Sequence, residues 1–98
     1  METIECGTTY RVMINDTEIT HERSVSFEPD DIKITIYGNE ATYQNWLKRK
    51  GETVNFKLTN TNINLQLYIK NVIFICRLEE VVEIVVRLTN EMNQHIRL

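Results

Sequence analysis

The residues of this chain that could do acid–base or metal chemistry are few and far apart. Its histidines are His21 and His95, and its thiols are Cys6 and Cys76. A metal centre needs several His, Cys or carboxylate ligands at matched spacing, and no Cys-x-x-Cys pair is present. We therefore expect no metal site and no cofactor. Two cysteines are too few for a disulfide scaffold, so we expect two free buried thiols in a reducing cytoplasm.

His21 is the strongest candidate for a catalytic group. His21 and Arg23 share strand parity with three apolar residues, so a regular strand would turn both toward the core. Three interpretations are open: a frayed or bulged strand that exposes both, a buried network with Glu5 or Asp16, or a catalytic site. Because the chain has no Gly-x-Ser-x-Gly motif and its glycines are isolated, we expect neither a serine nucleophile nor a phosphate loop. An enzyme is therefore not the favoured interpretation.

One cluster of basic and aromatic residues could bind nucleic acid. Its members are Tyr43, Trp46, Lys48, Arg49 and Lys50. Aromatic rings can stack on bases while Lys and Arg hold phosphates. In the structural alternative, Trp46 and Leu47 dock a helix on a sheet, and the cations complement the helix dipole. The net charge of −3 lacks the broad basic footprint of a nucleic-acid binder, which favours the structural alternative.

Alternating apolar residues predict that strands dominate the chain. The expected strands cover residues 4–14 with a bend at Gly7, 19–27, 32–37, 54–59, 63–69, 72–78 and 92–98. We expect Lys70–Asn71 to turn the chain between two of them. Residues 79–88 fit a strand or a helix, and their many β-branched side chains favour a strand.

One helix is expected over residues 40–50. Asn39 is a suitable N-cap, Glu40 suits the positive end of the helix, and Gly51 can adopt the left-handed conformation that follows a last turn. The residues that recur at helical spacing are Tyr43, Trp46, Leu47 and Lys50.

Length and composition favour one β-rich domain. The chain has 98 residues, of which 42% are hydrophobic and 26% are charged, and a chain of this length forms one core. We therefore expect a single domain over residues 1–98, an antiparallel β-sandwich or small barrel of about eight strands with one short flanking helix. No apolar run approaches the roughly 20 residues of a membrane span, and the acidic start does not resemble a secretory signal. These features predict a cytoplasmic protein with no membrane partner.

The last strands carry more apolar residues than one buried face needs. Val82, Ile84, Val86 and Leu88 supply that face, and Phe74 and Cys76 share it. The opposite parity, where an antiparallel sheet with one wet face is polar, carries Ile73, Ile75, Val81 and Val85, interrupted by Glu83 and Arg87. Such a patch needs a cover, which would be a second sheet, the helix or another subunit.

These observations predict a non-enzymatic assembly or partner-binding module that acts through this apolar sheet face and through strand edges. Its partner is itself, as a homo-oligomer, or another protein. Frequent Ile and Asn resemble the products of AT-rich phage or mobile-element genomes, which suggests a virion component or an inhibitor of a host protein. Two alternatives remain: a nucleic-acid-binding barrel that uses the basic-aromatic cluster, and a small enzyme around His21.

Overall fold

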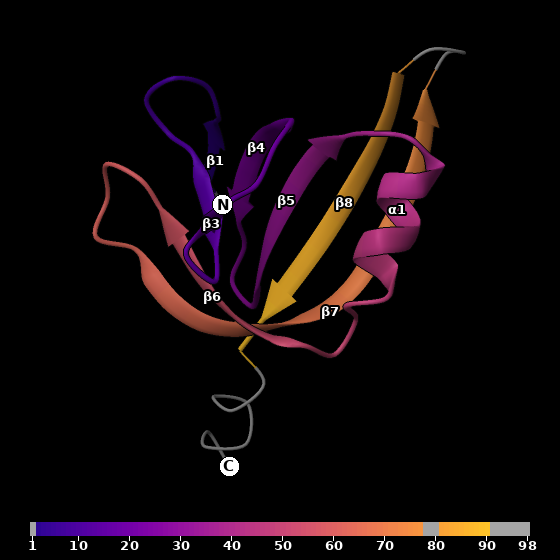
Figure 1. Cartoon of the computed structure of the whole chain (residues 1–98). Helices are drawn as coiled ribbons and strands as arrows, with labels where there is room; N and C mark the ends of the chain where they lie inside the picture. The colour runs from indigo at the N-terminus through magenta and orange to yellow at the C-terminus, as the bar shows by residue number, and fades with distance from the viewer. Residues whose placement is uncertain (1, 78–80, 91–98) are drawn as a thin grey trace.

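The computed structural model describes residues 2–77 and 81–90. They form one antiparallel eight-stranded sheet in the order β1-β4-β5-β8-β7-β6-β2-β3. The elements are β1 (Glu2–Glu5), β2 (Val12–Ile14), β3 (Thr17–Glu18), β4 (Glu22–Phe27), β5 (Asp31–Tyr37), α1 (Glu40–Leu47), β6 (Thr53–Leu58), β7 (Asn64–Arg77) and β8 (Val81–Thr89). The sheet curls into a half-barrel with α1 beside β7 (Figure 1). The mainly β fold predicted from the alternation is confirmed.

The core fills the inner side of the half-barrel. Six strands contribute to it, and each places alternate side chains inward. The buried apolar residues are Val12, Ile14, Val25, Ile32, Ile34, Ile36, Val54, Phe56, Leu58, Leu67, Ile69, Val72, Ile84, Val86 and Leu88. Residues 81–89 form strand β8, which lies near the middle of the sheet between β5 and β7. Of the strand and the helix that the sequence allowed over residues 79–88, the strand is therefore confirmed for residues 81–88.

The N-terminal residues form two strands rather than the predicted single strand over 4–14. The Gly7 N–H donates to the Tyr10 carbonyl at 3.0 Å, which closes a turn at the predicted bend. β1 pairs only with β4, whereas β2 pairs with β3 and β6 at the other end of the sheet order. The chain therefore crosses from one edge of the half-barrel to the other, which one straight strand cannot do.

β7 is one long strand where the sequence predicted two strands joined by a turn. The pairing with β8 shifts register between Ile69 and Asn71, so Lys70–Asn71 forms a bulge and not a turn. The extra residue changes the inward parity, so that Leu67 and Ile69 are buried before the bulge and Val72 after it. The first part of β7 pairs with β6 and the rest with β8, and the strand curves between them (Figure 1).

Helix α1 begins as predicted and ends three residues early. The Asn39 Oδ1 accepts the Thr42 N–H at 3.0 Å, which confirms the N-cap. From Arg49 onward the backbone hydrogen bonds join residues three apart instead of four, and Gly51 follows with a φ of 91°. No described helix is long and apolar enough to cross a membrane. The strand predicted over residues 92–98 lies outside the described residues.

Candidate functional site

The apolar residues singled out on the last strands lie on the outer face of the sheet. One row across β5, β8 and β7 joins Thr35, Val85 and Ile73, and the next joins Tyr37, Glu83 and Ile75. We call Tyr37, Ile73, Ile75 and Val85 the outer patch. Tyr37 is 44% exposed and Ile73 is 37% exposed, and the other two are half-buried. The side chain of Val81 lies outside the described part of the structure.

The helix packs on the opposite side of the sheet from the outer patch. The ring centroids of Tyr43 and Phe74 are 4.9 Å apart, and Phe74 packs against the core. Gly38, just before the helix, lies against Ile84, which is also an inward residue. Within residues 2–77 and 81–90, α1 therefore covers inner side chains and leaves the outer patch at the surface.

Three ion pairs lie in or beside the outer patch. Arg23 Nη1 lies 2.6 Å from Glu83 Oε2, Lys33 Nζ lies 2.8 Å from Glu28 Oε2, and Arg87 Nε lies 3.4 Å from Asp31 Oδ2. Glu83, predicted to face a contact, is only 4% exposed. Its carboxylate is paired with Arg23, whose guanidinium also lies 5.8 Å from the Tyr37 ring centroid.

Arg23 is exposed at a bulge between Glu22 and Ser24, and His21, which precedes β4, is also exposed. This confirms the bulged-strand interpretation, and the buried network with Glu5 or Asp16 is wrong. His21 adopts a left-handed φ of 64°, and its carbonyl accepts the Tyr37 N–H at 2.9 Å. The His21 side chain makes no hydrogen bond or ion pair within the described part of the chain, so no base–orienter pair is present there.

Glu22, which strand parity did not single out, is a buried carboxylate that links distant strands. Its side chain is 2% exposed, and it accepts the Val12 N–H at 3.0 Å and the Arg11 Nε–H at 3.2 Å. The hydrogen bond with Glu22 raises the pKa of Arg11 above its usual value. This contact joins β4 to β2, two strands from opposite ends of the sheet order. Strand alternation alone could not reveal it, because the bulge after Glu22 sets its direction.

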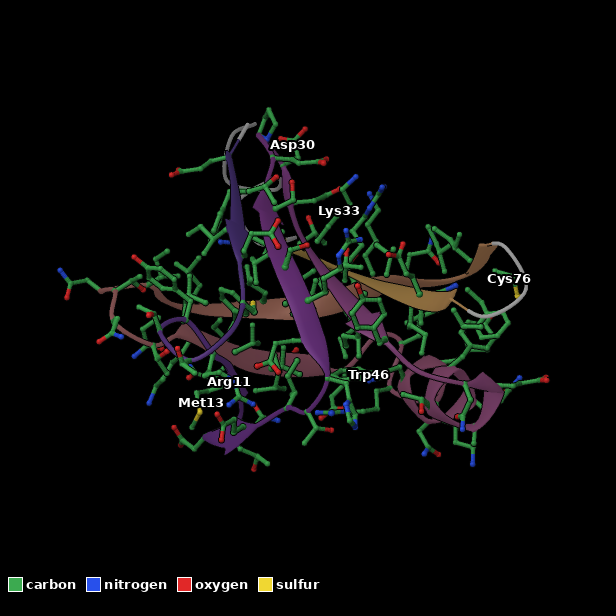
Figure 2. The ribbon with its side chains drawn as sticks, turned by 90° about the horizontal axis from the view of Figure 1, so that it is seen from above. Arg11, Met13, Asp30, Lys33, Trp46 and Cys76 are labelled. Carbon is green, nitrogen blue, oxygen red and sulfur yellow. The ribbon has the colours of Figure 1, made fainter. Side chains whose placement is uncertain are left out.

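Both thiols are free. Cys6 is half-buried, and burial raises its pKa to about 11, with a smaller effect from the Glu22 carboxylate. Cys76 is exposed, so the expectation of a buried thiol is wrong there. Its partner in the ladder is Val82, close to the end of the β7–β8 hairpin and beyond the core (Figure 2).

The basic-aromatic cluster divides between the interior and the surface. Tyr43, Trp46 and Leu47 pack against the core, which confirms that the helix docks through Trp46 and Leu47. The Arg49 guanidinium lies 5.0 Å from the Trp46 ring centroid and binds both Glu52 oxygens, at 2.7 and 3.2 Å. Lys48 and Lys50 are exposed.

In the described part of the chain, no group of three His, Cys, Asp or Glu side chains could hold a metal ion. Comparisons of the chain with protein-family models, curated proteins and solved structures found no match.

Proposed function

We propose that this protein is a non-enzymatic module that self-associates by packing its outer sheet face against the same face of a second copy. The observation that carries the proposal is the outer patch of Tyr37, Ile73, Ile75 and Val85 on three adjacent strands. Single exposed apolar residues are ordinary, but a contiguous group marks a contact. On the composition argument, its setting is a small phage or mobile-element protein, in the cytoplasm or in a virion.

A second copy suits this face because the cations described next to the outer patch are paired with carboxylates. Arg23, Lys33 and Arg87 are each paired with a carboxylate, so three positive charges meet three negative ones. The whole chain carries a charge of −3, so two copies repel each other at long range. Paired charges beside the contact add little to that repulsion, and symmetric dimers join identical patches of two subunits.

The contact would resemble the core of a β-sandwich. Two sheets that pack face to face lie about 10 Å apart, with side chains interdigitating between them. A stable dimer buries about 800 Å² per partner, roughly an eighth of the 6333 Å² accessible surface of the chain. Ile73 is 37% exposed and Val85 is already half-buried, so burial of their remaining surface would contribute at most about 3 kcal/mol before the cost of association.

Charge introduced into the patch tests the proposal. We expect Val85→Asp and Ile73→Asp to make the protein monomeric in size-exclusion chromatography with light scattering, because each buries an unpaired carboxylate in the contact. Gln66→Asp is the matched control, since Gln66 is exposed on the β6-paired part of β7, away from the patch. Thermal melting of each variant checks the fold. If Ile73→Asp melts like the parent and stays a dimer, the patch is not the contact.

A further inference from the structure

The outward side chains of β5, β8 and β7 form rows that run across the sheet. Successive rows are two residues apart along each strand, because neighbouring residues of a strand point to opposite faces. In order along the strands, three of these rows are Lys33–Arg87–Asn71, Thr35–Val85–Ile73 and Tyr37–Glu83–Ile75. The middle row of the three has no charged side chain, so the charges of this part of the face lie to either side of it.

The two charged rows carry ion pairs that are opposite in order along β8. On one side of Val85, Glu83 binds the Arg23 guanidinium at 2.6 Å, and the Arg23 side chain remains 47% exposed. On the other side of Val85, the Arg87 Nε lies 3.4 Å from the Asp31 Oδ2. The outward residues of β8 are therefore a carboxylate, a valine and a guanidinium, and their charge changes sign at Val85.

Two copies that pack through the same face are related by a two-fold axis in the plane of the contact. Packed sheets keep their strand directions within about 30° of each other, so this axis runs either along the strands or across them. An axis along β8 places each residue of β8 against itself. Glu83 would then face Glu83 and Arg87 would face Arg87, and the two Arg23 guanidiniums bound to Glu83 would meet. Like charges that face each other in a contact oppose association.

An axis across the strands avoids these contacts when it follows the uncharged row. Thr35, Val85 and Ile73 then meet their own copies, and β8 of one chain runs antiparallel to β8 of the other. Each Glu83 faces Arg87 of the second copy, on both sides of the axis. The complementary charges of the two copies thus favour this arrangement and set its register.

We propose that two copies pack with their β8 strands antiparallel, about a two-fold axis that crosses the strands at the row Thr35–Val85–Ile73. The inference rests on the proposed self-association through the outer patch and adds its orientation. Because the sheet curls away on either side of β8 (Figure 1), the middle strands form the contact. Ile73 then lies against Ile73 of the second copy, whereas an axis along β8 would place it against Thr35.

Mixtures of charged variants distinguish the two axes. With the axis across the strands, Ile73→Asp and Ile73→Lys each place like charges together, and a mixture of the two places opposite charges together. We expect the mixture to associate at least about tenfold more tightly than either variant alone in sedimentation equilibrium. The matched mixture of Ile73→Asp with Thr35→Lys should show no such gain. The proposal is overturned if the Thr35→Lys mixture gains and the Ile73 mixture does not, or if neither gains although the parent is a dimer.

Spin labels at Asp30→Cys give an independent measurement. Asp30 is exposed just before β5, five residues from Thr35, and Cys6→Ala with Cys76→Ser leaves it as the single thiol. At about 3.3 Å per residue, the axis across the strands places the two labelled positions more than about 30 Å apart, and the axis along β8 places them within about 20 Å. The shorter distance in a dimer overturns the proposed orientation and leaves self-association intact. A parent that stays monomeric overturns both.

Discussion

The Glu22 carboxylate connects two parts of the sheet that share no ladder. It accepts hydrogen bonds from Arg11 and from the Val12 backbone while its side chain is 2% exposed. We expect Glu22→Ala to lower the free energy of unfolding by about 1–3 kcal/mol, because a buried N–H and part of a guanidinium lose their acceptor. Urea denaturation measures this effect.

The control for Glu22 is Glu18, which binds the same guanidinium at 2.9 Å but is 47% exposed. Exposed ion pairs contribute between about zero and 1 kcal/mol, so Glu18→Ala should change stability by less than about 1 kcal/mol. Equal losses for the two variants would show that the Glu22 contact does not join the strands.

The Cys6 thiol makes the free energy of unfolding depend on pH in the alkaline range. Its pKa is about 11 in the folded chain against 9.0 in an unfolded one, chiefly through burial. Below pH 9 the thiol is protonated in both states. Between pH 9 and 11 the unfolded thiol ionises while the folded one keeps its proton, so the free energy of unfolding falls as the pH rises. We expect this fall to be steeper in the parent than in Cys6→Ala, as measured by denaturation at several pH values; parallel curves would contradict the assignment.

At the scale of elements, the junction between β5 and α1 requires a glycine because there is no room for a side chain. A Cβ at Gly38 would lie 2.8 Å from Ile84 Cδ1 and 2.9 Å from Thr42 Cβ. We expect Gly38→Ala to destabilise the fold by about 1–3 kcal/mol through overpacking. Gly7→Ala is the control, since a Cβ there meets nothing within 4 Å. Thermal melting compares the two, and an unchanged melting temperature for Gly38→Ala would mean that α1 shifts freely on the sheet.

Elements differ in how far the sequence predicts them. The alternation of Ile32, Ile34 and Ile36 predicts a strand and its buried face because both depend on one chain segment. The Asn39 cap is equally local. The bulges at Arg23 and at Lys70–Asn71 depend on the strands paired beside them, so the direction of Glu22 and the continuity of β7 could not be predicted.

At the scale of the whole molecule, the surface of interest is the outer patch on β5, β8 and β7. The sequence predicted most of it from parity, since Ile73, Ile75 and Val85 stand opposite the buried residues of their strands. We expect the outer patch to bind a second copy of the chain.

Sedimentation equilibrium over a range of protein concentrations tests this claim most directly. Two outer faces in contact double the 11.6 kDa mass of the chain, and association follows mass action. We expect the average mass to rise with concentration toward that doubled value, and Val85→Asp to hold it at the mass of one chain. A parent protein that keeps the mass of one chain up to about 1 mM, a concentration at which even weak contacts form, would contradict the account.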